Sequence, residues 1–235
     1  MSSGAGIPIT TVSRALASGG SNNSSALYAL VRDVVEGTET RDVIVDVGCG
    51  KGALHGHLQG LFSRYVGIDV VRHAGFPTAP DATLLEASLD DGPSVLPAGI
   101  ADVICCLETI EHLENPRLLA RCLSQIAKPG CLLIVSTPNQ LSLLSKVCLL
   151  VKNEFVHFQE RPGLYPAHLS ALLECDLRRI AHESGWEEAT VLFSGEGRVP
   201  GTDRLWPAWL TARHGWRGRA FSDNVVLTAR KPWAT

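Results

Sequence analysis

The sequence lacks the features that mark several large classes of protein. Its seven cysteines are an odd number with no C-x-x-C pair, so neither a disulfide framework nor a zinc cluster is supported. No G-x-S-x-G segment is present, which argues against a serine-hydrolase triad. Positive charge is not in excess, because 21 basic and 24 acidic side chains leave a net charge of −3. This balance disfavours binding to nucleic acid or to an anionic membrane.

Long apolar runs are also missing. The N-terminal segment holds no run typical of a signal peptide. The most apolar stretch, Leu141–Val151, is interrupted by Ser142, Ser145 and Lys146 and is too short to span a bilayer, so no stable membrane insertion is expected. The cysteines lie mostly in apolar runs such as Val103–Leu107, where they act as small hydrophobic side chains. This usage indicates a reducing compartment, and we expect a cytoplasmic protein.

What the chain does contain is enough apolar material for a folded core. At about 150 residues per domain, 235 residues correspond to roughly 1.6 domains. The hydrophobic content of 45% and the charged content of 19% exclude a disordered chain. We expect an N-terminal arm and helix over residues 1–38 and one domain over residues 39–235.

Apolar strands alternate with helices along most of the chain. The pattern predicts strands at 43–47, 65–70, 83–87, 101–107, 131–136, 188–193 and 225–229. It predicts helices at 24–35, 52–62, 116–127 and 174–184. Strands that are apolar throughout are typical of an α/β fold, in which helices cover both faces of a mostly parallel sheet. The last two strands have no helix between them, which indicates an antiparallel pair at one edge.

A glycine-rich turn follows the first strand. Gly48, Gly50 and Gly52 let the chain turn sharply and approach a ligand closely. The same turn opens dinucleotide sites, so the glycines alone leave an NAD-type oxidoreductase open. Asp46 disfavours that alternative, because its carboxylate would repel a pyrophosphate but attract a cationic amino-acid group. Asp69 ends the second strand, where it is placed to bind ribose hydroxyls. A helix cap or a turn former remains the alternative role of either acid.

These motifs together resemble a known family. The segments D-V-G-C-G-K-G (46–52), G-I-D (67–69) and E-T-I-E-H-L (108–113) resemble class I S-adenosylmethionine-dependent methyltransferases, over about residues 40–230. The segments S-T-P-N (136–139) and G-W (185–186) resemble the ubiquinone-biosynthesis O-methyltransferase-like group. The resemblance implies a Rossmann-like sheet of seven strands in the order 3-2-1-4-5-7-6, with the seventh strand antiparallel.

The resemblance also implies a site for S-adenosylmethionine, with S-adenosylhomocysteine as the product. Asp46 and the three glycines would line the methionine side, and Asp69 would hold the ribose. The adenine side departs from the family pattern, because Ser88 stands where an acidic residue is usual. The cofactor-binding residues expected on this basis are Asp46, Gly48, Cys49, Gly50, Gly52, Asp69, Val70, Ser88, Leu89, Leu107 and Glu108.

Candidate catalytic residues follow the fourth strand. Glu108, Glu111 and His112 are spaced i, i+3 and i+4, which places them on one face of a helical turn. An acceptor hydroxyl must lose a proton during methyl transfer, and histidine is the side chain best suited to take it near neutral pH. His112 is therefore the candidate general base, with Glu111 beside it. A role for His112 in shaping the pocket alone stays open.

The same side chains are compatible with a metal site. With His168 or His157 as a fourth ligand, they resemble the Glu-x-x-Glu-His site of RNA 3′-terminal 2′-O-methyltransferases, which would suit Mn²⁺ or Mg²⁺. However, His168 lies in a segment that also matches metal-independent relatives, and the chain lacks the positive charge expected for RNA binding. We therefore expect no metal. A catalytically inactive, cofactor-binding partner subunit is a further alternative.

Two insertions, near 140–168 and 195–222, are predicted to flank the carboxyl ends of the strands and to form the acceptor pocket. The apolar side chains of 141–151 would contact an apolar acceptor, pack on the sheet, or pack on a second subunit of a homodimer. The second insertion carries basic and aromatic side chains: Arg198, Arg204, Arg213, Arg217, Arg219, Trp206, Trp209 and Trp216. They would bind an anionic or aromatic acceptor group, or form a solvated loop. We expect a small-molecule acceptor such as a quinone precursor, a natural product or a sugar.

Overall fold

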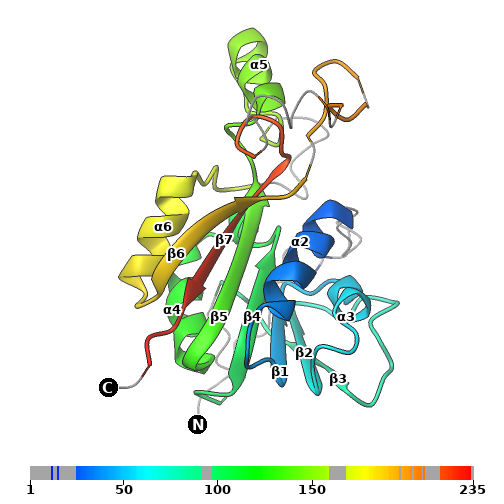
Figure 1. The fold of residues 1–235 in the computed structure, drawn as a ribbon, viewed down its shortest axis with the longest axis vertical. Coiled ribbons are helices and arrows are strands. Elements are labelled where there is room, and N and C mark those ends of the chain that lie inside the picture. The colour runs from blue at the N-terminus through cyan, green and yellow to red at the C-terminus, as the bar shows by residue number, and fades with distance from the viewer. Residues whose placement is uncertain are drawn as a thin grey trace.

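A seven-stranded sheet lies at the centre of the computed structural model, with helices on both faces (Figure 1). The structure describes residues 12, 15, 25–90, 97–158, 168–195, 197–202, 204–207, 209 and 218–233. The strand order is β3-β2-β1-β4-β5-β7-β6, with β7 antiparallel to both of its neighbours and the first five strands parallel. The expected fold class and sheet order are therefore confirmed.

The predicted elements are present, and most boundaries agree within two residues; the end of α3 and the start of β5 differ by more. The strands are β1 Val43–Val47, β2 Arg64–Asp69, β3 Ala82–Glu86, β4 Ala101–Leu107, β5 Ala127–Pro138, β6 Glu187–Phe193 and β7 Asn224–Arg230. The helices are α2 Ser25–Glu36, α3 Ala53–His57, the 3₁₀ turn η1 Ile110–His112, α4 Pro116–Ile126, α5 Leu143–Lys152 and α6 Glu174–Glu183. Helix α3 ends earlier than predicted, and Gly60 has a φ of 85° just beyond it. Strand β5 begins earlier, because Ala127 pairs with Ala101 and the Gly130 N–H donates to the Lys231 carbonyl.

Two apolar layers hold the helices on the sheet. On one face, Leu27, Val31 and Val35 of α2 are fully buried in a cluster that also contains residues of β1, β2, β4 and β5. On the other face, α4 and α6 pack with the buried Trp186 against the same strands. Burying one such aliphatic side chain completely stabilises the fold by about 1.5–3 kcal/mol relative to leaving it in water. Helix α2 therefore belongs to the same core as the sheet.

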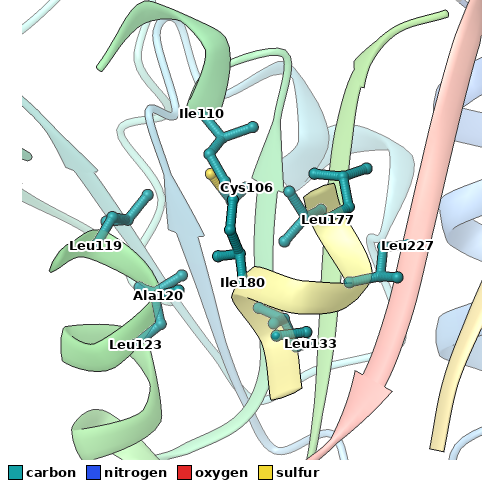
Figure 2. A pocket seen from close by; sticks show the side chains of 11 residues that line it. Cys106, Ile110, Leu119, Ala120, Leu123, Leu133, Leu177, Ile180 and Leu227 are labelled. Carbon is teal, nitrogen blue, oxygen red and sulfur yellow. The ribbon is translucent and has the colours of Figure 1, made fainter. Parts of the chain in front are cut away.

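A small apolar cavity lies in the second layer, between α4, α6 and the sheet (Figure 2). Its volume is about 20 Å³. Its lining side chains are aliphatic apart from Cys106. A water molecule needs polar partners as well as space, so this cavity is a dry packing gap rather than a ligand site.

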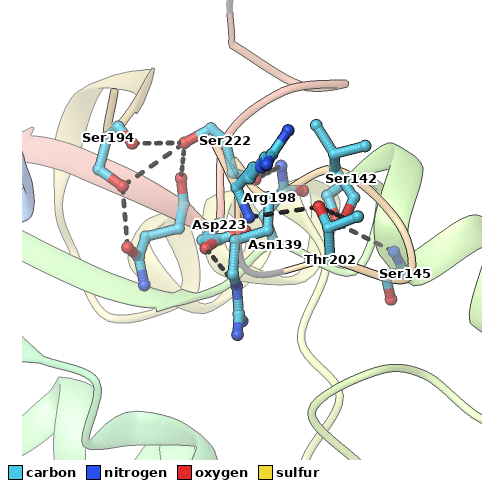
Figure 3. Close-up of polar contacts among 11 residues, drawn as sticks. Asn139, Ser142, Ser145, Ser194, Arg198, Thr202, Ser222 and Asp223 are labelled. Atoms are coloured by element: carbon cyan, nitrogen blue, oxygen red, sulfur yellow. Dashed lines mark hydrogen bonds and ion pairs between the residues drawn. The ribbon is translucent and has the colours of Figure 1, made fainter. Parts of the chain in front are cut away.

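The carboxyl ends of the parallel strands carry both insertions. Helix α5 and the described part of the second insertion lie beyond the upper ends of β5 and β7 (Figure 1). Asn139 connects them, because its Nδ2 donates to the carbonyls of Arg219 and Ser222, both at 2.8 Å. The Ser222 Oγ lies 2.9 Å from the carbonyl oxygens of both Ser194 and Asn224 and can donate its one hydrogen to either, which fastens the same loop to β6 and β7 (Figure 3). Among the described helices, none is long and apolar enough to cross a bilayer.

Candidate functional site

The glycine-rich turn after β1 has the backbone geometry that requires glycine. Gly48, Gly50 and Gly52 have φ angles of 72°, 52° and 69°, in the left-handed region that side chains disfavour. Gly48 is also sterically constrained, since a Cβ there would lie 2.2 Å from the Thr109 Oγ1. The turn therefore sits directly against the loop that follows β4.

Most N–H groups of this turn are already used within the protein. Gly48 and Cys49 donate to the Ile68 carbonyl at 2.8 and 3.2 Å. Gly50 donates to Asp69 Oδ2 at 2.8 Å, and Gly52 donates to the Cys49 carbonyl at 2.8 Å. A pyrophosphate needs such groups free. The geometry therefore disfavours an NAD-type site.

Asp46 lies at the end of β1 and is 4% exposed. The Tyr65 hydroxyl donates a hydrogen bond to its carboxylate. Burial raises the pKa of Asp46 to about 7, the hydrogen bond from Tyr65 lowers it, and the charge of Asp69 raises it further. A cationic group placed beside Asp46 would stabilise its ionised form. The carboxylate of Asp46 is thus an acceptor that fits the ammonium of an amino-acid moiety.

Asp69 fastens the second strand to the glycine turn. Its Oδ2 accepts from Gly50, and its Oδ1 accepts from the Val70 N–H at 2.7 Å. Each carboxylate oxygen has two lone pairs, so one on each remains for a hydroxyl group. A vicinal diol is the partner that fits two adjacent acceptors.

The segment expected at the adenine side runs beside the end of β2. The Ala87 N–H donates to the Asp69 carbonyl at 2.8 Å. Leu89 is buried, whereas Ser88 and Val70 are half-buried. Asp90, two residues beyond Ser88, accepts from the Glu114 N–H at 2.8 Å and so connects this segment to the loop after η1.

Glu108 begins the loop after β4, directly after the buried Leu107. Its φ of 49° is rare outside glycine and costs on the order of 1–3 kcal/mol. The Ser136 hydroxyl donates to Glu108 Oε1 at 2.9 Å. Burial raises the pKa of Glu108 to about 7, hydrogen bonds from Ser136 and Asn224 lower it, and the charge of Asp223 raises it. Strained backbone held by several partners is common at functional sites.

Glu111 lies in η1 and is fully buried. Neither of its carboxylate oxygens has a hydrogen-bond partner among the described residues. Burial raises the pKa of Glu111 well above its usual range, and the charge of Glu108 raises it further. The Thr137 side chain lowers the same pKa by a smaller amount. An ionised carboxylate left in this state would be strongly destabilising.

His168 joins Glu111 and His112 through the backbone. The Glu111 carbonyl accepts from the N–H groups of Leu169 and Ser170, at 2.8 and 3.0 Å. The ring of His168 thereby lies 4.6 Å from that of His112, between centroids. One ligand atom from each of Glu111, His112 and His168 lies within 4.8 Å of the others. We call these three residues the Glu–His–His cluster.

The ring of His168 has a defined orientation. Its Nδ1 lies 2.7 Å from the His157 carbonyl, which can only accept, so Nδ1 carries the hydrogen. Its Nε2 lies 3.9 Å from Glu111 Oε1. Burial lowers the pKa of His168, and it lowers that of His157 to about 4. The side chains of His157 and Glu108 do not belong to the Glu–His–His cluster. His157 orients the ring of His168 through its backbone carbonyl, and the Glu108 carboxylate accepts from the Ser136 hydroxyl instead.

Two tyrosines of the site were not among the predicted site residues. Tyr28 of α2 has a pKa raised to about 12 by burial and by the charges of Asp46 and Glu108, which places it near both acids. Tyr65 donates to Asp46. The only sequence signal for either was its place in an apolar helix or strand.

The first insertion exposes apolar side chains to solvent, whereas arginines of the second insertion form ion pairs. Leu150 and Val151 of α5 are 83% and 75% exposed, so they do not line the site. Arg198 pairs with Asp223 at 3.2 Å, and Arg219 makes a bidentate pair with Glu174 at 2.6 and 2.7 Å. These pairs favour a structural role for both arginines. Other members of the predicted set, Arg213, Arg217 and Trp216, lie outside the described residues.

Comparison with known proteins shows which family the chain resembles. The family described as "Methyltransferase domain" matches residues 21–191. A ubiquinone biosynthesis O-methyltransferase of Methylococcus capsulatus is 31% identical over 172 residues, covering 68% of this chain and 70% of the relative. The mitochondrial ubiquinone biosynthesis O-methyltransferase of Dictyostelium discoideum is 30% identical over 129 residues, covering 48% and 40%. The chain thus spans less than half the length of the latter enzyme.

Solved structures share the fold at low sequence identity. A SAM-dependent methyltransferase from Archaeoglobus fulgidus superposes with a TM-score of 0.63 at 16% identity, covering 89% of this chain and 95% of that one. A methyltransferase of Haloferax volcanii, solved in complex with the Trm112 activator, gives a TM-score of 0.65 at 14% identity, covering 96% and 99%. These likenesses concern the fold alone.

Proposed function

Because the chain belongs to the S-adenosylmethionine-dependent methyltransferases, we propose that it methylates a hydroxyl oxygen of a small-molecule acceptor. The products are the methyl ether, S-adenosylhomocysteine and a proton. The observation that supports this proposal is the Glu–His–His cluster. Glu111 and His112 lie on the loop after β4 that touches the glycine turn, and His168 approaches them from the segment before α6.

The cofactor supplies an electrophilic methyl group on a sulfonium when it is bound. We assign its ammonium group to Asp46 and its ribose hydroxyls to Asp69, because each carboxylate is buried and held by neighbouring donors. Displacement at the methyl carbon needs alignment more than bond polarisation, so fixed positions for both reactants are the main requirement. The hydrogen-bonded glycine turn meets that requirement on the cofactor side.

The acceptor hydroxyl must lose its proton as the new C–O bond forms. We propose that His112 takes this proton, with Glu111 beside it in the Glu–His–His cluster. A phenolic hydroxyl is the acceptor we favour, because the named relatives act in ubiquinone biosynthesis as O-methyltransferases. Natural-product and sugar hydroxyls remain the other candidates for the acceptor screen.

Two measurements test this function. Calorimetry with S-adenosylhomocysteine and, separately, with NAD should detect only the former, and absence of S-adenosylhomocysteine binding would overturn the proposal. A screen of phenols, quinols and sugars with isotope-labelled cofactor should then show transfer to oxygen. Binding without transfer to any acceptor would instead favour a cofactor-binding partner subunit.

A further inference from the structure

We infer that Asn224 is a positioning residue that couples Glu108 to the second insertion, so that a ligand held at Glu108 also stabilises the loop expected to receive the acceptor. This coupling deepens the proposed function, on which it rests for the identity of the ligand but not for the coupling itself. Three observations carry it: the partners of the Asn224 amide, the place of Glu108, and the bonding of Ser194 and Ser222. Ser194 and Ser222 lie at the two ends of the second insertion, and we call them its stem.

The first observation is that the Asn224 amide has a different partner on each side. Asn224 begins β7 and is 7% exposed. Its Oδ1 accepts from the Ser194 hydroxyl at 2.8 Å, which fixes the orientation of the amide. The same side chain hydrogen-bonds to the Glu108 carboxylate, which can only accept, so Nδ2 is the donor. One amide thus joins an acid that follows β4 to a serine that follows β6.

The second observation is that fixed partners hold Glu108 in a strained conformation. Ser136 Oγ accepts from the Glu108 N–H at 3.0 Å and donates to Glu108 Oε1 at 2.9 Å, so it holds both backbone and carboxylate at a φ of 49°. Ser136 is itself fully buried in β5. Glu108 is only half-buried, so lone pairs of its carboxylate stay accessible to a ligand. Asn224 is the partner that connects this carboxylate to the stem.

Glu108 also lies beside the residues that we assign to the cofactor. The next residue, Thr109, touches the glycine turn, since a Cβ on Gly48 would lie 2.2 Å from its Oγ1. The charges of Asp46 and Glu108 both raise the pKa of Tyr28, which places the two carboxylates near one hydroxyl group. Glu108 is therefore the acid that the cofactor side shares with the second insertion.

The third observation is that both ends of the second insertion converge on Asn224. The Ser194 N–H donates to the Asn224 carbonyl at 3.3 Å, and Ser222 Oγ lies 2.9 Å from the same carbonyl oxygen. The hydroxyl oxygens of Ser194 and Ser222 are 3.5 Å apart (Figure 3). All three side chains are buried. Displacing the stem would leave buried polar groups unpaired, which is unfavourable, so the stem and the Asn224 amide move together.

The coupling has a consequence for the order in which ligands bind. A ligand that contacts Glu108 restrains the carboxylate, which favours the bonded orientation of the Asn224 amide and hence the bonded stem. By reciprocity, an acceptor that stabilises the second insertion raises the affinity for the cofactor by the same factor. Such couplings typically change affinity by about 5- to 150-fold.

The test follows hydrogen exchange of the Ser194 N–H by nuclear magnetic resonance, with S-adenosylhomocysteine as the probe ligand. In the parent chain, saturating S-adenosylhomocysteine should slow this exchange by at least about fivefold. Asn224→Ala should lose that slowing when it is saturated with the same ligand, and should bind the ligand at least about fivefold more weakly. Thr228→Ala trims a half-buried side chain of the same strand and should behave as the parent does.

Glu108→Asn tests the same contact in the ligand-free chain without altering β7. Asparagine adopts a positive φ more readily than most residues, and its shorter side chain withdraws from Asn224. Exchange at Ser194 should become at least about fivefold faster in Glu108→Asn, although this residue does not contact Ser194 directly. Adding Glu108→Asn to Asn224→Ala should give no further increase, because the connection is already broken.

The outcomes separate the coupling from the proposed function. Faster exchange at Ser194 in Glu108→Asn, with no further increase in the double variant, supports the coupling. Unchanged exchange in Glu108→Asn overturns it, and so does a ligand effect that persists in Asn224→Ala. If the parent chain does not bind S-adenosylhomocysteine, the proposed function is overturned, and the ligand-free comparison still decides whether Asn224 couples Glu108 to the stem.

Discussion

The two halves of the candidate site are built in opposite ways. On the cofactor side, Asp46 and Asp69 are buried, and each already accepts hydrogen bonds from neighbouring groups. On the acceptor side, Glu111 is buried without a hydrogen-bond donor among the residues that the structure describes, and its Oε1 lies 3.9 Å from the Nε2 of His168. The difference teaches that the cofactor half is preorganised by the protein itself. The acceptor half instead keeps a buried carboxyl group that the described residues do not satisfy.

The largest expected effect is the loss of turnover in His112→Ala. Removing the proposed general base should lower kcat by about 10²- to 10⁴-fold. The affinity for S-adenosylhomocysteine should stay within about twofold, because His112 belongs to the acceptor half. Steady-state kinetics and calorimetry on the same variant check this. Equal turnover in the variant and the parent would remove His112 from the role of general base.

The complementary change is Asp69→Ala in the cofactor half. It removes two expected hydrogen bonds to the ribose and the acceptor that fixes the Gly50 N–H. Hydrogen bonds to charged groups contribute about 1.5–3 kcal/mol each, so the affinity for S-adenosylhomocysteine should fall by about 100-fold or more. Asp33→Ala, at an exposed position of α2, is the matched control. If His112→Ala and Asp69→Ala each reduced affinity equally, the division into two halves would be wrong.

A third variant probes the contact between the halves. Gly48→Ala combines a φ of 72° with a Cβ that would lie 2.2 Å from Thr109 Oγ1. Gly60→Ala has a φ of 85° but open space around the added methyl group, so it measures the backbone cost alone. We expect about 1 kcal/mol of destabilisation for Gly60→Ala and clearly more for Gly48→Ala in urea unfolding. Similar losses of unfolding free energy in the two variants would show that the Thr109 side chain moves away from the added methyl group without destabilising the protein.

The smallest expected effect is a pH dependence of cofactor binding. The pKa of Asp46 is raised to about 7, and a cationic ammonium favours the ionised carboxylate. Affinity for S-adenosylhomocysteine should therefore rise by up to about tenfold per unit between about pH 5.5 and pH 7 and level off above. Asp46→Asn should flatten this profile when it is measured by calorimetry. If the affinity of Asp46→Asn still rose with pH over the same range, a group other than Asp46 would be responsible for the pH dependence.

The same pKa predicts the opposite trend for stability. Between the unfolded value of 3.8 and the folded value of about 7, the native chain keeps a proton on Asp46 that the unfolded chain has released. The contribution of this residue to the free energy of unfolding therefore falls as pH rises through that window and is constant above it. The cofactor-free chain and its Asp46→Asn variant can be compared by urea unfolding at about pH 5 and pH 7.5.

Much of the cofactor half could be predicted from the sequence, because it is encoded locally. The strand–turn–helix containing Gly48, Gly50 and Gly52 and the acid that ends β2 each occupy one short segment. The sheet order followed from the family resemblance. Tyr28 and Tyr65 could not be identified, since an aromatic residue in an apolar helix or strand gives the same pattern whether or not it faces an acid.

The acceptor half was less predictable, because long-range contacts assemble it. The spacing of Glu108, Glu111 and His112 indicated a shared helical face, but η1 spans three residues only and Glu108 bonds to Ser136 instead. His168 was a candidate in the sequence, yet its place depends on two N–H groups that donate to the Glu111 carbonyl. No local pattern encodes such a contact.

The Asn139 amide has a consequence for how new acceptors can be accommodated. It holds the second insertion by the carbonyls of Arg219 and Ser222, groups that every amino acid possesses. Side chains in that insertion other than Arg198, Arg219 and Ser222, which make bonds of their own, can therefore change without loosening its attachment to β5. A protein attached in this way can exchange the surface that selects its acceptor and keep the scaffold that holds its cofactor, so grafted loops of other sequence should be tolerated there.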